Sequence, residues 1–270
     1  MVLSLIFNLI IGCLMIFSTI SAIVGFDFMK TGWESNPPNW WIFKFFTVLS
    51  NIWAGLCALV MAGAEICMLA AGTAASNAAA SFPTWAWALK LSGASAVMLT
   101  FVVTVCYLAP QEPKGYFALF TNWDLFYHAV IPLLCIISFM FIDKPAALGM
   151  YVAASSDGAA LAGTASAAVS AASSGSAAAV SAAAASALAG GEVFNPGFVY
   201  TLAGVVPTAL YAVFYTINVV KHLGPNKEVD RKYDWYNFLM GNYRLIPVVV
   251  PLICGVSYGF SCLLWAVNRI

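Results

Sequence analysis

MVLSLIFNLIIGCLMIFSTISAIVGF, residues 1–26, decides the fold class, because this stretch is predominantly apolar and holds no charged residue. A bilayer core about 30 Å thick is crossed by about 20 apolar residues at 1.5 Å per residue. We therefore expect a first membrane span here. A secretory signal peptide is the alternative, but the stretch lacks the positively charged start, and its apolar part is longer than such peptides have.

The composition of the whole chain indicates the same class of protein. Hydrophobic residues make up 62% of the 270 positions and charged residues 8%, against roughly 25% charged in an ordinary soluble domain. A soluble fold of this length could not bury so much apolar surface. Turn-forming residues and tryptophans flank five further apolar stretches. These are 41–69, 85–109, 125–142, 197–220 and 245–267. The sequence predicts an all-α polytopic membrane helical bundle with six transmembrane helices.

The stretches divide the chain into two helical groups of one membrane domain. Residues 1–143 carry helices one to four and residues 197–270 carry helices five and six, with a low-complexity extramembrane insertion over residues 144–196. Between residues 153 and 191, 33 of 39 residues are Ala, Ser or Gly. Alanine is too weakly apolar to hold a span by itself, so we expect a flexible or transiently helical segment. A seventh helix that lies on or crosses the membrane is the alternative, since alanine favours helix.

Charge and cysteine usage exclude several function classes. Lys and Arg balance Asp and Glu at 11 each, so no basic field exists to attract nucleic acid. The 7 cysteines lie in apolar runs without a paired cysteine motif, and they predict neither a disulfide framework nor a metal site. No cofactor is expected, and the predicted partners are membrane lipids.

Lysine and arginine positions predict the orientation. The loops after spans one, three and five hold eight of these residues, and the opposite side holds three, Lys90, Lys144 and Arg269. The prediction is a multi-pass protein of the cell membrane with odd-numbered loops in the cytoplasm. The termini and the Ala/Ser insertion would then lie outside.

Polar residues gather at the predicted cytoplasmic ends of the spans, whereas no Asp, Lys or Arg lies near the middle of any span. Because alternate helices run in opposite directions, these residues form one polar layer on one membrane side. His128 is the only histidine inside a span, and an imidazole there needs a partner or a role. Threonines bonded to their own helix and tyrosines anchored at the interface are the structural alternative. The layer includes Lys44, Thr47, Asn51, Thr100, Thr104, Tyr107, Asp124, His128, Tyr211 and Tyr215.

Two segments, FFTVLSN at 45–51 and FYHAVIP at 126–132, resemble the androgen-induced-gene-like (AIG-like) integral membrane family, nearer its bacterial branch. LTFVV at 99–103 and LAP at 108–110 lie between them. The resemblance covers about residues 40–143. Some animal members are threonine hydrolases that cleave fatty-acid esters of hydroxy fatty acids. The resemblance implies Thr47 as the nucleophile and His128 as its base.

The remaining polar residues are expected to support that site or bind its substrate. Lys44 and Asn51 are candidate donors to an oxyanion, because they share a helical face with Thr47. Asp124 is a candidate to orient His128. Further supporting residues are Thr104, Tyr107 and Tyr215.

Three function hypotheses follow. The first is an intramembrane threonine hydrolase of a lipid ester at the cytoplasmic leaflet, using Thr47 and His128. The second is a non-enzymatic carrier or binder of a lipid or small apolar solute. The third is a structural or assembly subunit whose polar layer only joins helices.

Overall fold

A computed structural model describes residues 1–26, 29, 40–74, 82–113, 116–152, 192–193 and 195–270 of the chain. Within these ranges, six helices are long and apolar enough to cross a membrane, which confirms the predicted six-span all-α bundle. We number them as spans one to six, and their ends lie within a few residues of the predicted ones. They are Val2–Val24, Phe46–Ala70, Thr84–Gln111, Asn122–Ile142, Phe198–Lys221 and Tyr243–Asn268.

Several spans change helix type along their length. Span three is built from α3 (Thr84–Val103), η2 (Thr104–Leu108) and η3 (Ala109–Gln111). Span four is built from α4 (Asn122–Leu125), η5 (Phe126–Val130), α5 (Ile131–Ile137) and η6 (Ser138–Ile142). The segments η2, η5 and η6 are π-helical, a conformation that recurs at functional sites. The elements are α1 (Val2–Val24), η1 (Trp40–Lys44), α2 (Phe46–Ala74), α3 (Thr84–Val103), η2 (Thr104–Leu108), η3 (Ala109–Gln111), η4 (Tyr116–Phe120), α4 (Asn122–Leu125), η5 (Phe126–Val130), α5 (Ile131–Ile137), η6 (Ser138–Ile142), α6 (Pro145–Leu148), β1 (Tyr151–Val152), β2 (Glu192–Val193), η7 (Phe198–Val205), α9 (Val206–Lys221), η8 (Tyr243–Leu245) and α10 (Ile246–Asn268).

Span two begins later than predicted. The tryptophans at its expected start lie in η1, a short 3₁₀ helix, and α2 begins at Phe46. Trp40 and Trp41 are 70% and 71% exposed, as suits indole rings at a membrane interface. Thr47 is consequently the second residue of α2 rather than a residue several positions inside it.

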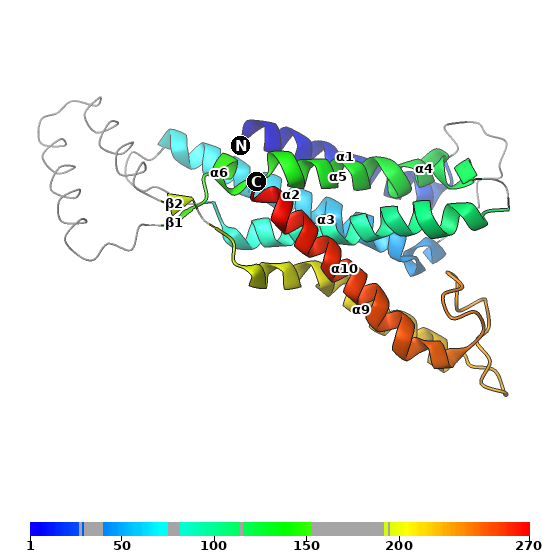
Figure 1. Ribbon diagram of the computed structural model, residues 1–270. Helices are drawn as coiled ribbons and strands as arrows, with labels where there is room; N and C mark the ends of the chain where they lie inside the picture. The colour runs from blue at the N-terminus through cyan, green and yellow to red at the C-terminus, as the bar shows by residue number, and fades with distance from the viewer. Residues whose placement is uncertain (27–28, 30–39, 75–81, 114–115, 153–191, 194) are drawn as a thin grey trace, which may run out of the picture.

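Span three forms the centre of the bundle. In its most apolar part 56% of the residues are buried inside the protein, against 11% in span six. Its helix α3 packs against α2, α5, η7, α9 and α10. Figure 1 shows α9 and α10 inclined to the other helices, so that they diverge from them toward the end opposite the termini.

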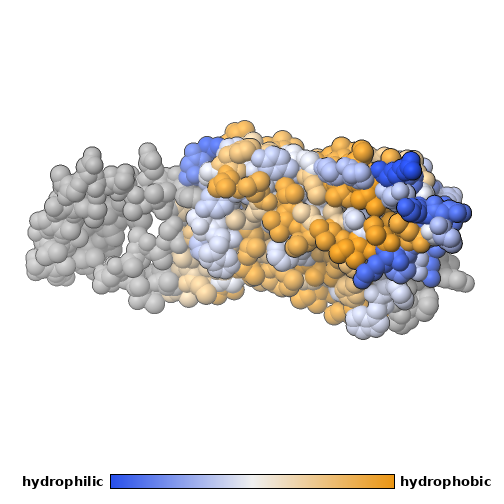
Figure 2. Space-filling view, turned by 90° about the horizontal axis from the view of Figure 1, so that it is seen from below, coloured by the Kyte–Doolittle hydropathy of each residue, from blue (hydrophilic) through white to orange (hydrophobic). Residues whose placement is uncertain are grey.

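The surface carries a broad apolar band between two polar ends, as Figure 2 shows. Large exposed apolar side chains on α1, α9 and α10 contribute to it, among them Leu3, Leu210, Val213, Val248 and Leu252. A soluble protein seldom exposes so much contiguous apolar surface. The band fits a multi-pass membrane protein.

Both chain ends and the flanks of the Ala/Ser insertion lie at one end of the bundle (Figure 1). After the short helix α6, strand β1 pairs antiparallel with β2, so Tyr151 lies opposite Val193. The insertion therefore leaves and re-enters the bundle at one place. The predicted flexible segment and its alternative, a seventh helix, fall within residues 153–191, which lie outside the described residues.

Lys90 lies in α3 near the end that bears the termini, which is the side on which the orientation prediction counted it. It is, however, 1% exposed, so it does not contribute a charge to the loops of that side. Removing it from the count leaves eight lysines and arginines against two. The reason for its burial is a set of polar partners, described below.

Candidate functional site

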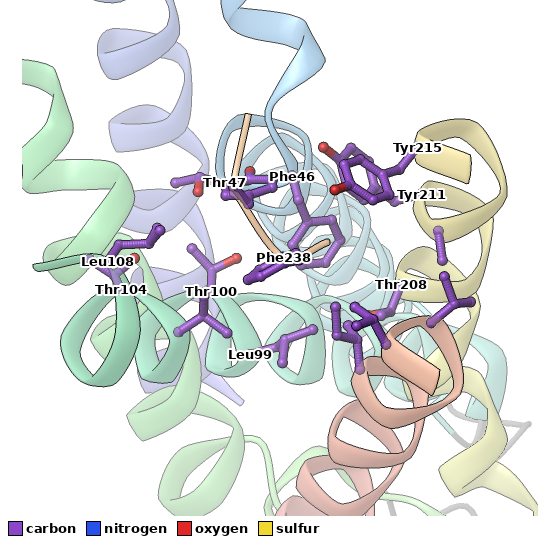
Figure 3. A pocket seen from close by; sticks show the side chains of 16 residues that line it. Phe46, Thr47, Leu99, Thr100, Thr104, Leu108, Thr208, Tyr211, Tyr215 and Phe238 are labelled. Atoms are coloured by element: carbon purple, nitrogen blue, oxygen red, sulfur yellow. The ribbon is translucent and has the colours of Figure 1, made fainter. Parts of the chain in front are cut away.

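A partly enclosed cavity of about 60 Å³ lies between spans two, three, five and six, at the end away from the termini. Sixteen residues line it, and none of these is charged. Figure 3 shows Phe46 and Thr47 on one side and Thr100, Thr104 and Leu108 of span three on another. The only polar groups of the lining side chains are hydroxyls, which belong to Thr47, Thr100, Thr104, Thr208, Tyr211, Tyr215 and Tyr236.

A loop from the distant C-terminal part of the chain covers one side of this cavity. We call residues 233–239 the aromatic loop, and two of its side chains, Tyr236 and Phe238, line the cavity. Asp234 shapes the loop, because it accepts hydrogen bonds from the backbone N–H groups of Phe238 (3.0 Å) and Leu239 (2.9 Å). It also accepts one from the Tyr215 hydroxyl. The carboxylate thus joins the loop to α9.

Three further hydrogen bonds hold the aromatic loop against the helices. The Thr47 backbone N–H donates to the Tyr236 hydroxyl at 3.4 Å. The Trp235 indole donates to the Tyr211 hydroxyl at 2.9 Å. The Tyr107 hydroxyl donates to the Asn237 carbonyl at 3.3 Å. The loop is therefore tied to spans two, three and five.

Tyr236 is the residue of the aromatic loop that is hydrogen-bonded to Thr47, and both residues line the cavity. It is 8% exposed and bonded to the first turn of α2. Burial raises the pKa of its phenol above the usual value, and the hydrogen bonds with Thr47 offset part of that rise. The phenol therefore stays neutral at physiological pH, and its oxygen accepts a hydrogen bond from the Thr47 backbone N–H without bringing charge into the cavity.

The predicted catalytic pair is not joined by a hydrogen bond. Thr47 is 8% exposed and lines the cavity, whereas His128 is 6% exposed and is absent from the lining residues. The His128 Nδ1 atom lies 2.7 Å from the Leu119 carbonyl oxygen. Because a carbonyl only accepts, Nδ1 carries the proton and Nε2 is the basic nitrogen.

Asn51 links the helix turn that holds Thr47 to the segment that holds His128, through hydrogen bonds to backbone carbonyls. Its Nδ2 donates to the Thr47 carbonyl at 2.7 Å and to the Tyr127 carbonyl at 2.8 Å. An amide nitrogen has two hydrogens, and both are used. Asn51 therefore has no donor left for an oxyanion, and its part is to position α2 against η5.

Lys44 and Asp124 also differ from the roles expected of them. The Lys44 ammonium lies over aromatic rings, 4.9 Å from the Phe45 centroid and 5.3 Å from that of Trp235, a favourable arrangement for a cation. Asp124 Oδ1 lies 3.9 Å from His128 Nδ1, beyond hydrogen-bond distance. The Leu119 carbonyl orients the imidazole instead.

Of the remaining predicted residues, Thr104 and Tyr215 line the cavity. Thr104 is fully buried, and its hydroxyl has no hydrogen-bond partner among the described residues. Tyr107 reaches the aromatic loop, with its ring 5.3 Å from that of Phe238. The structure thus gathers Thr47, Thr104 and Tyr215 at one cavity, with Tyr107 beside it.

The sequence pattern missed two groups of residues. The aromatic loop could have been noticed from its density of Trp, Tyr and Phe, but nothing local shows that it reaches span two. The second group contains Lys90 and Asp143, which form a buried ion pair near the other end of the bundle. The sequence feature that could have indicated this group is the presence of single polar residues inside apolar stretches, among them Asn8, Glu65 and Lys90.

Comparison of the chain with protein-family models, curated proteins and solved structures finds no match. The resemblance of residues 40–143 to the AIG-like family therefore stays an expectation. The function has to be argued from the cavity and its residues.

Proposed function

We propose that this chain is a membrane binding protein or carrier that holds the apolar part of a lipid, or a small apolar solute, in the cavity under the aromatic loop. The observation that carries the proposal is an uncharged cavity with one buried, unpartnered hydroxyl, that of Thr104. Burial of apolar ligand surface contributes about 25 cal/mol per Å². A ligand oxygen that bonds the Thr104 hydroxyl would also remove the cost of leaving it unsatisfied.

A route from the bilayer supports this proposal. A second, more open hollow of about 300 Å³ lies between α2 and α9, and it shares Phe46 and Tyr211 with the cavity. The two rings lie 5.0 Å apart at the boundary. Rotation of either ring would connect the hollow with the cavity, so an acyl chain would enter sideways from the lipid.

The proposed location is the cell membrane, with the cavity near the cytoplasmic leaflet. The excess of lysine and arginine in the odd-numbered loops supports this orientation. Membrane lipids would then supply the ligand. A cavity with both apolar side chains and hydroxyls in its lining suits a molecule with one polar end.

A retention experiment tests the binding function. Purified protein is incubated with tritiated methyl oleate, and the retained label is counted. Ile253→Trp fills the cavity and should lower retention about tenfold, the effect of a loss of roughly 1.4 kcal/mol. Leu252→Trp is the matched control, because Leu252 is 62% exposed on the neighbouring position of α10. Equal retention by both variants and the wild type would contradict the proposal.

A second candidate function is hydrolysis of a lipid ester with Thr47 as nucleophile and His128 as base. Its support is the place of Thr47 at the cavity wall and the basic Nε2 of His128. Since His128 does not line the cavity, this reaction would require the imidazole to move toward Thr47. Labelling by a fluorophosphonate probe tests it. Loss of labelling in both Thr47→Ala and His128→Ala is expected, and labelling that persists in Thr47→Ala excludes this chemistry.

A further inference from the structure

A buried cluster of charged and polar side chains joins the spans near the end that bears the termini. Its centre is the ion pair between Lys90 Nζ of α3 and Asp143 Oδ2, 3.7 Å apart. Lys90 is 1% exposed and Asp143 is fully buried. Two charges buried together persist only when further hydrogen bonds satisfy them.

The partners of Asp143 satisfy its carboxylate. Ser138 donates to Oδ2 at 2.7 Å, and the Ser4 hydroxyl donates to Oδ1. With Lys90, the carboxylate therefore has three favourable contacts. These contacts satisfy both oxygens of the carboxylate.

Asn8 of α1 links the ion pair to a second carboxyl group. Its Oδ1 accepts from Lys90 Nζ at 2.5 Å, and its Nδ2 donates to Glu65 Oε2 at 3.4 Å. Glu65 is fully buried on α2, and its Oε1 has no hydrogen-bond partner among the described residues. One long hydrogen bond is much less than an ionised carboxylate requires in a protein interior.

The charge balance decides the protonation of the cluster. Lys90 supplies one positive charge, and Asp143 and Glu65 would supply two negative charges if both were ionised. A net charge in this buried place would be costly, whereas one neutral carboxylic acid beside one ion pair is not. The unpartnered Oε1 marks Glu65 as the group that stays neutral.

We propose that the cluster is a proton-binding site in which Glu65 holds one proton while Lys90 and Asp143 remain an ion pair. The occupant is a single proton, taken up by the Glu65 carboxylate from water and returned to it. Glu65 lies five residues before the end of its span at Ala70, which is roughly 7 Å along a helix. Exchange therefore occurs with water at the end that bears the termini.

No other described charge offsets an ionised Glu65. The N-terminal ammonium donates to the Ala147 carbonyl at 3.0 Å, and the Arg269 guanidinium lies 4.4 Å from the Trp265 ring centroid. The α10 residue that reaches the cluster, Asn268, is neutral and bonds the Asp143 carbonyl. Cys57 and Cys135 are buried in spans two and four, and a cysteine thiol, with an ordinary pKa of about 8.5, carries no charge at pH 7.

Infrared spectroscopy of the full-length protein in lipid at pH 7 tests the proton site, because a protonated carboxylic acid has a carbonyl band separate from that of a carboxylate. The wild-type spectrum minus that of Glu65→Gln should contain one such band, that of Glu65, because the bands of other acids cancel in the difference. Glu228→Gln, at an exposed carboxylate of the loop after α9, is the matched control and should change nothing.

Two further variants test the charge balance. Lys90→Met removes the positive charge, so both acids should be protonated and the band should grow about twofold, since two groups then contribute. Asp143→Asn leaves Lys90 without its partner, so Glu65 should ionise in its place and the band should disappear. The two changes have opposite signs, and a general loss of packing would not produce both.

Several outcomes would overturn the proposal. They are a wild-type spectrum equal to that of Glu65→Gln, and a Glu65 band that is unchanged in both Lys90→Met and Asp143→Asn. A band present in choline chloride but lost in sodium chloride would assign the site to a metal cation instead of a proton. None of these results bears on the lipid cavity, because the cluster shares no residue with it.

Discussion

The Asn51 amide donates to the carbonyl oxygen of Tyr127 at 2.8 Å, and this bond couples the first turns of α2 to the π-helical segment that holds His128. The same nitrogen bonds the Thr47 carbonyl. Thr47 and His128 are therefore related through the backbone contacts of one amide and not through their own side chains. Substitution of Asn51 should therefore weaken the contact between α2 and η5.

Asn51→Leu should lower the free energy of unfolding by about 1–3 kcal/mol, because two buried carbonyl groups lose their donor. Thermal unfolding in detergent measures the change. Asn218→Leu is the matched control, since the Asn218 side-chain nitrogen has no hydrogen-bond partner among the described residues. Equal losses in the two variants would show that the bridge contributes nothing specific.

Asp234→Asn should loosen the aromatic loop. The neutral amide is a weaker acceptor for the Phe238 and Leu239 N–H groups and for Tyr215, so we expect a loss of about 1.5–3 kcal/mol. Faster cleavage of the loop by a protease and weaker retention of methyl oleate should accompany it. Asp230→Asn alters an exposed acid just before the aromatic loop, and it should leave both readouts near the wild-type values.

The burial of Tyr236 predicts an alkaline loss of stability. Its folded-state pKa is raised above the value of about 10 in the unfolded chain. The unfolded state therefore releases this proton first, and the stability present below pH 10 declines as the pH rises through the folded pKa. Tyr236→Phe should show a shallower fall of melting temperature above pH 10 than the wild type. An identical pH profile would contradict this contribution.

Close packing of α3 against α2 predicts a position-specific effect of alanine. A Cβ at Gly93 would lie 2.9 Å from Ala54 Cα, whereas a Cβ at Gly63 would meet no atom within 4 Å. Gly93→Ala should destabilise the protein by about 1–3 kcal/mol through overpacking. Gly63→Ala should be neutral or stabilising by up to about 1 kcal/mol, because alanine favours helix. The ordering of the two melting temperatures checks the prediction.

The sequence predicted the spans well and the site only in part. Span ends follow from apolar runs interrupted by Pro, Gly and charged residues, and these are local features. The gathering of Thr47, Thr104 and Tyr215 at one membrane depth follows from helix direction and the rise per residue. Depth alone does not tell which way each side chain points, so it could not show that Thr47 lines the cavity whereas His128 does not.

By itself, the sequence determined that six helices cross the membrane, because the transfer of about 20 apolar residues into hydrocarbon outweighs every local preference. Only the tertiary structure decided that Tyr236, 189 residues further along the chain, reaches the amide of Thr47. It also decided that Lys90 and Asp143 meet. Such pairings depend on how each helix is rotated and on which distant segment fills the space beside it. Helix rotation and segment pairing are set by side-chain packing and by the hydrogen bonds that buried polar groups make across the whole bundle.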